Sequence, residues 1–158
     1  MEYIYFLTKK DIMKLSKEIA NGLLIFLGII FLFFIFKILG LEKVSYLRIF
    51  NGLVVYLVFH RMQIKNMKEG KVGFGENFFS IFRTGLIGVF LSVIALSTYA
   101  SYNGGQTYLA TLSHGFLFGK NPTVNEYCFG LLIEGMASVA AISFICIQSW
   151  KTKTSKSI

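Results

Sequence analysis

The chain has 158 residues, of which 54% are hydrophobic and only 15% charged, and its formal net charge at pH 7 is +8. Soluble domains carry about 25% charged residues, so this composition excludes an ordinary soluble domain. The basic residues lie between and beside apolar runs, which is typical of a membrane protein and gives no reason to expect a nucleic-acid partner.

Residues 1–18 precede the first apolar run and have mixed charge. Thr8 is followed three residues later by Asp11, an acceptable pair for capping a helix. We therefore expect an amphipathic N-terminal segment that forms a short interfacial helix on the membrane, with a simple extension of the first span as the alternative. No small-residue cleavage motif closes the apolar run that follows, so we expect no removed signal peptide.

Two uncharged stretches are long enough to cross a bilayer. The first has 18 residues between Glu18 and Lys37, and the second has 36 residues between Arg83 and Lys120. A hydrocarbon core of ~30 Å needs about 20 helical residues. A core helix of a soluble protein is rarely apolar on all sides over such a length. The chain is therefore expected to be an integral membrane protein.

The apolar pattern predicts an all-α fold, a bundle of four transmembrane helices within residues 19–150. The second span is the weakest, because only 12 uncharged residues separate Arg48 from Arg61. An Asn-Gly-Gly stop at 103–105 ends the third span, and a short interfacial helix is expected before Pro122 in the loop that follows. The expected spans and the basic tail comprise residues 19–39, 44–60, 85–102, 124–150 and 151–158.

The distribution of basic residues predicts the orientation. With both termini in the cytoplasm, 12 of the 16 Lys and Arg residues lie in segments on the inside and 4 on the outside. Five lysines are expected to mark the cytoplasmic side and to contact anionic lipid headgroups at about 1 kcal/mol each. They are Lys65, Lys68 and Lys71 in the loop between the second and third spans, and Lys151 and Lys153 in the tail.

The same loop contains Gly70, Gly73 and Gly75 within the sequence GKVGFGENFF. This stretch lacks the G-x-x-x-x-G-K-[ST] order of a phosphate-binding loop, and its glycines do not follow the G-x-G-x-x-G order either. We therefore expect the glycines to permit the reversal of the chain between two helices.

Several short motifs carry a resemblance to a known family. They are LRIFN at 47–51, GKVGFGENF at 70–78, RTGLIGVFLSVIALSTYASY at 83–102, FGKNP at 118–122 and IEGMASVAAISFICIQSWK at 133–151. Together they resemble a family of four-helix inner-membrane proteins of unknown function that is common in Bacteroidota, over roughly residues 19–152. The resemblance implies a bacterial cytoplasmic membrane protein with four spans and no established activity.

Arg48 and Glu134 are ionisable residues within the expected spans, where such a side chain costs about 2.5 to 3.5 kcal/mol at a helix centre. Both are expected in the outer half, and Asn51 lies on the same helix face as Arg48. We predict a polar cluster of Arg48, Asn51 and Glu134. Two roles stay open: a clasp that fixes helix packing, or a relay or binding site for a proton, an ion or a polar headgroup.

The sequence gives no motif for catalysis or for a cofactor. The acids are few and dispersed, no nucleophile elbow surrounds the Ser-His pair at 113–114, and no His pair suits a haem. Cys128 and Cys146 have no metal-ligand spacing and, on one helix, would lie ~27 Å apart, too far for a disulfide. We expect a non-enzymatic accessory or scaffolding subunit that contacts lipids and either other membrane subunits or its own copies. The alternative is a small transporter or permeation component that uses the polar cluster.

Overall fold

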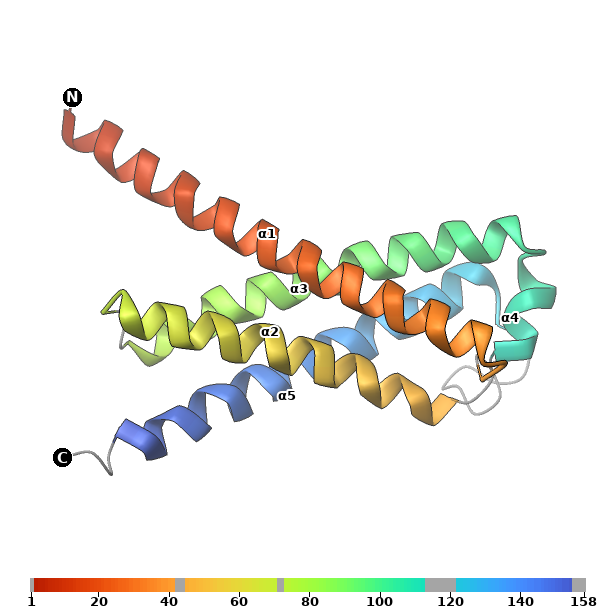
Figure 1. Ribbon diagram of the computed structural model, residues 1–158. Helices are drawn as coiled ribbons and strands as arrows, with labels where there is room; N and C mark the ends of the chain where they lie inside the picture. The colour runs from red at the N-terminus through yellow and green to blue at the C-terminus, as the bar shows by residue number, and fades with distance from the viewer. Residues whose placement is uncertain (1, 42–44, 71–72, 113–121, 155–158) are drawn as a thin grey trace.

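The computed structural model describes residues 2–41, 45–70, 73–112 and 122–154, and within these ranges the secondary structure is helical (Figure 1). The elements in chain order are α1 (Glu2–Ile38), the 3₁₀ turn η1 (Ser45–Arg48), α2 (Ile49–Lys68), α3 (Phe74–Tyr102), α4 (Gln106–Leu112) and α5 (Val124–Thr154).

Three of these helices contain stretches long and apolar enough to cross a membrane: Leu15–Ile38, Phe74–Tyr102 and Val124–Ser149. The prediction of an all-helical chain with membrane-spanning segments is confirmed to this extent. Among the described helices, α2 falls short of the same length of apolar sequence, because Arg61, Lys65 and Lys68 occupy its C-terminal half.

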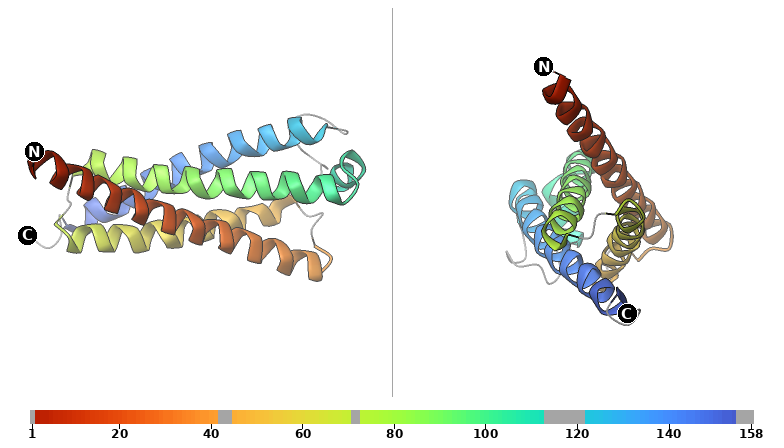
Figure 2. Two further views of the ribbon diagram at one scale, coloured as in Figure 1. Left: turned by 90° about the horizontal axis from the view of Figure 1, so that it is seen from above. Right: turned by 90° about the vertical axis from the view of Figure 1, so that its left-hand side faces the viewer.

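α1 is one continuous helix of 37 residues, about 55 Å long at the usual rise per residue. Residues 2–18 thus form an extension of the first apolar stretch rather than a separate surface helix. The sequence explains the continuity, because no glycine or proline precedes Gly22. The beginning of α1 projects away from the other helices (Figures 1 and 2).

The connection between α2 and α3 is shorter than the loop expected at 61–83. α2 continues to Lys68 and α3 begins at Phe74. Arg61 and Arg83 lie on the helices with exposed side chains, so their charges stay solvated and do not end the helical segments. Gly70 has φ +75, a conformation that favours glycine, and permits the reversal as expected.

The end of α3 agrees with the predicted stop. Asn103 caps the helix, and Gly104 and Gly105 follow with φ +105 and +59. The short helix α4 then lies in the loop where an interfacial helix was predicted, while residues 113–121, including the Ser-His pair, lie outside the described residues. After Pro122 the chain enters α5 through a capping box, in which Thr123 N–H donates to Glu126 Oε2 at 2.8 Å and Glu126 N–H donates to Thr123 Oγ1 at 3.3 Å.

The long helices pack in a cyclic order: α1 lies against α2 and α3, and α5 lies against the same two helices from the other side (Figure 2). The start of α1, the end of α5 and the α2–α3 turn lie at one end of the molecule (Figure 1). We call this the turn end. The opposite end, where α1 and α3 finish and α2 and α5 begin, is the α4 end.

A cluster of buried apolar side chains from all the long helices holds them together, including Ile25, Phe59, Ile81 and Val139. α1 and α3 approach closely where glycines meet, since a Cβ added to Gly88 would lie 3.2 Å from the Gly22 carbonyl oxygen. Small residues at such a crossing let two helix backbones come together.

Candidate functional site

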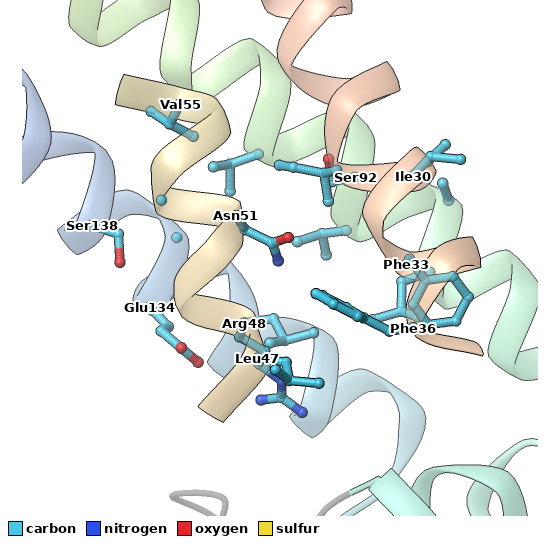
Figure 3. A pocket seen from close by; sticks show the side chains of 18 of the residues that line it. Ile30, Phe33, Phe36, Leu47, Arg48, Asn51, Val55, Ser92, Glu134 and Ser138 are labelled. Atoms are coloured by element: carbon cyan, nitrogen blue, oxygen red, sulfur yellow. The ribbon is translucent and has the colours of Figure 1, made fainter. Parts of the chain in front are cut away.

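A cavity of about 410 Å³ lies between α1, α2, α3 and α5 in the half of the molecule toward the α4 end (Figure 3). Its volume is within the range of ligand pockets, about 300 to 1,000 Å³. Most of its wall is apolar, with phenylalanines from α1 and aliphatic side chains from α3 and α5. The polar residues in the wall are Arg48, Asn51, Ser92, Tyr99, Tyr127, Glu134 and Ser138.

Arg48 is the last residue of η1 and directly precedes α2. Its guanidinium donates a hydrogen bond to the Tyr127 hydroxyl and also lies over the Tyr127 ring, 5.6 Å from the ring centroid. Tyr127 is 1% exposed and packs in a second apolar cluster with Leu109 and Leu112 of α4. The contact therefore ties the start of α2 to the start of α5 and fixes the Arg48 side chain at the cavity wall.

Asn51 lies one turn after Arg48 on α2 and is half-buried. Figure 3 shows its amide directed into the space between α2 and the α1 phenylalanines Phe33 and Phe36. The amide offers both donors and an acceptor to whatever occupies this space.

Glu134 comes from α5 and lines the same cavity with an exposed side chain. Within the described residues its carboxylate makes no hydrogen bond or ion pair, although it lies close enough to the Tyr127 hydroxyl to act on it electrostatically. The structure thus brings Arg48, Asn51 and Glu134 to one cavity, but it does not join Arg48 to Glu134 directly. The guanidinium contacts Tyr127, a residue that the sequence reasoning did not select.

Lys37 is a second cation near this cavity, and the sequence did not indicate it as part of the site. Lys37, at the end of α1, donates a hydrogen bond to the Tyr99 hydroxyl and lies 4.7 Å from the centroid of that ring. Tyr99 lines the cavity and packs edge-on against Phe33, with their ring centroids 5.5 Å apart. Each of the two cations, Lys37 and Arg48, is therefore held on a tyrosine at the α4 end.

The lysines selected for topology lie away from this cavity. Lys65 and Lys68 are exposed on the last turns of α2 at the turn end, and Lys151 and Lys153 fall in the last turns of α5 at the same end (Figure 1). Lys71 lies outside the described residues. The contact of these lysines with lipid headgroups stays a prediction.

Among the described residues, no group of three or more His, Cys, Asp or Glu side chains could hold a metal ion. Cys128 is half-buried and Cys146 buried, and both are free thiols. No protein-family model, no curated protein and no solved structure matches the chain.

Proposed function

We propose that this is a bacterial inner-membrane protein in which α2 serves as a fourth span beside α1, α3 and α5, with both termini in the cytoplasm. The start of α1, the end of α5 and the α2–α3 turn share one end of the molecule, as four crossings require (Figure 1). The exposed Lys65 and Lys68 at that end support a cytoplasmic location, because basic residues gather on the inner side of a membrane. The α4 end then faces outward.

We further propose that the protein binds an amphiphilic molecule in the α4-end cavity, as a binding component for transport or permeation. The observation that carries this proposal is the combination of volume and wall: about 410 Å³, mostly apolar, with Arg48, Asn51 and Glu134 on one side. Ligand sites are typically apolar pockets with a few converging polar groups that orient the ligand.

The cavity wall has an apolar part and a polar part, and each suits a different part of the ligand. Phe33 and Phe36 of α1 offer a surface for a hydrocarbon chain, while Arg48 can donate to a phosphate or carboxylate head. Glu134 has no protein partner in the described part of the chain and can receive an amine. A lipid or lipid-like molecule with a small polar head satisfies each of these groups.

Filling the cavity tests this function. Ala95 lines the cavity from α3, whereas its neighbour Ile94 is 49% exposed and faces away from it. In the delipidated protein, Ala95→Trp should reduce binding of phosphatidylethanolamine and phosphatidylglycerol, counted as bound adducts by native mass spectrometry. The matched Ile94→Trp variant should retain them, with helicity by circular dichroism as the control for folding. Equal binding by both variants would refute the proposal.

An accessory or scaffolding subunit is the second candidate, and one observation on α5 favours it. Ala137 and Ala141 are exposed one turn apart on this helix, and neither lines the cavity. Small residues let another helix approach closely. Co-purification from native membranes in mild detergent tests this candidate: a stoichiometric partner lost on Ala137→Leu supports it, and a chain without any partner or second copy excludes it.

A further inference from the structure

A second polar region lies inside the molecule at the turn end, and the proposed function does not use it. Glu18 of α1 is 2% exposed, although it is a carboxylate within the apolar stretch Leu15–Ile38. Ser80 of α3 donates to Glu18 Oε1 at 2.8 Å. Within the described residues this is the one hydrogen bond to that carboxylate. A charge so deeply buried is costly unless further partners compensate for the lost water.

A small pocket of about 30 Å³ lies beside Glu18. Such a space is large enough for a water molecule, which needs about 10 to 15 Å³ by the same measure, and therefore for an ion no larger than water. It is formed where α1, α2 and α3 meet. The lining residues are Lys17, Glu18, Asn21, Met62, Lys65, Asn66, Glu69 and Ser80.

The hydrogen bond of the Asn21 side chain determines which atom of its amide has no hydrogen-bond partner. Asn21 Nδ2 donates to the Lys17 carbonyl oxygen at 2.8 Å. A carbonyl oxygen can only accept, so the amide cannot be turned the other way. The Asn21 side chain therefore keeps its oxygen, Oδ1, as an acceptor without a partner among the described residues.

The same reasoning applies to Asn66 of α2. Asn77 Nδ2 donates to the Gly73 carbonyl oxygen at 3.0 Å, so Asn77 presents its oxygen to Asn66. The Asn66 side chain therefore contributes its nitrogen, Nδ2, which donates to Asn77 Oδ1 at 2.9 Å. Asn66 Oδ1 is again left as an acceptor, so one pocket is lined by the carboxylate residue Glu18 and by two Asn residues that each keep an oxygen without a donor among the described residues.

The charges in the lining leave Glu18 as the acid that lacks an ion pair. Lys17 pairs with Glu69, with Nζ 3.0 Å from Oε1, and both side chains of this pair reach solvent. Lys65 is exposed, where its ammonium keeps its hydration. The pocket therefore combines a buried carboxylate that has no ion pair with two amide side chains that each keep an oxygen acceptor, while the lining lysines are paired with Glu69 (Lys17) or exposed (Lys65).

We propose that this turn-end pocket binds one monovalent inorganic cation, Na⁺ or K⁺, through Glu18, Asn21, Asn66 and Ser80. Hard cations take oxygen ligands such as carboxylates, amide oxygens and hydroxyls. A single carboxylate balances a single positive charge, whereas a divalent cation at this carboxylate would leave a buried positive charge without compensation. Because the four ligands come from α1, α2 and α3, the bound cation stabilises the contact of these helices at the turn end.

Thermal unfolding of the full chain in detergent, followed by circular dichroism, tests this site. NaCl, KCl and choline chloride are compared at equal ionic strength. The Tm should rise with Na⁺ or K⁺ in a saturable manner and should not rise with choline. Glu18→Gln should abolish the rise, while Glu76→Gln, an exposed acid at the same end, should preserve it. Identical Tm values in all three salts would overturn the proposal.

Two further variants keep the test decisive if Glu18→Gln does not fold. Asn21→Ala retains the buried carboxylate and should raise the cation concentration for half-maximal stabilisation about tenfold. The variant Lys65→Met tests whether the Lys65 ammonium, rather than an inorganic cation, occupies the pocket. Cation-dependent stabilisation that persists in this variant supports the site, and stabilisation that first appears when Lys65 is removed would show that the lysine is the natural occupant.

Discussion

The two polar regions of the molecule differ in size, burial and the way their charges are held. At the α4 end the charged groups lie at a large apolar cavity. Both cations there contact tyrosine rings: Lys37 contacts Tyr99, and Arg48 contacts Tyr127. At the turn end Glu18 is enclosed beside a pocket of about 30 Å³. A large apolar wall suits an amphiphile, whereas a small pocket of oxygen atoms suits an ion.

The largest effect is expected from Ser80→Ala at the turn end. It removes the hydrogen bond to a carboxylate that is 2% exposed, and a bond to a charged group is worth about 1.5 to 3 kcal/mol. Thermal unfolding should show a loss of about 2 kcal/mol in the free energy of unfolding. The control is Ser101→Ala, whose exposed hydroxyl bonds only to its own helix, and whose loss should stay within about 0.5 kcal/mol.

A smaller loss of stability is expected from Tyr127→Phe at the α4 end. The variant keeps the ring beneath the Arg48 guanidinium and removes only the hydroxyl that accepts its hydrogen bond. The expected loss is about 1.5 kcal/mol by thermal unfolding, the lower end of the range for a bond to a charged group, because Arg48 is less buried than Glu18. Tyr102→Phe serves as the control, because Tyr102 is 92% exposed and should change stability little. A loss at Tyr102 as large as that at Tyr127 would contradict the anchoring role of the Arg48 contact.

The variant Glu134→Gln tests whether the Glu134 side chain holds the helices together, as a clasp would, or binds a ligand. The side chain is exposed and makes no ion pair in the described residues, so the free energy of unfolding should change by less than about 0.5 kcal/mol. Affinity for phosphatidylethanolamine should fall about fivefold through loss of the charge on the cavity wall, while affinity for phosphatidylglycerol should not fall. Native mass spectrometry titrations measure both. A large loss of stability with unchanged lipid preference would instead favour the clasp.

The smallest effect is expected from Glu69→Gln. It breaks an ion pair with Lys17 whose side chains are 51% and 31% exposed, and such pairs contribute about 0 to 1 kcal/mol. The change in Tm should shrink further as salt is raised, because salt screens exposed charges. A loss of stability as large as that of Ser80→Ala would contradict the view that the exposed Lys17–Glu69 ion pair contributes less to stability than the buried Ser80–Glu18 hydrogen bond.

Hydropathy was sufficient to predict the apolar stretches of α1, α3 and α5 and the stop after α3. It was a poor guide to helix limits near charges, because Arg61 and Arg83 can remain on a helix while their side chains reach solvent. Arg48, Asn51 and Glu134 were selected as polar residues in apolar surroundings, and the structure brings them to one cavity.

The partners of these residues could not be predicted from the sequence. In the sequence Tyr127 and Tyr99 look like ordinary interfacial aromatics. Only the packing of α5 against α4 and of α1 against α3 shows that their hydroxyls accept hydrogen bonds from Arg48 and Lys37, respectively. Glu18 was missed because it ends a charged segment and resembles a solvated boundary residue. It is buried because α1 continues as one helix along α3, which local sequence does not reveal.

The central claim is that the α4-end cavity holds an amphiphile, and photolabelling tests it most directly. A phospholipid with a photoreactive acyl chain is incorporated with the purified protein into nanodiscs, and the adducts are located by peptide mass spectrometry. The claim predicts adducts at the cavity residues Phe33 and Leu96 that disappear in Ala95→Trp, beside adducts at the exposed Phe90 that persist. Adducts confined to exposed residues, or cavity adducts unchanged by Ala95→Trp, would contradict it.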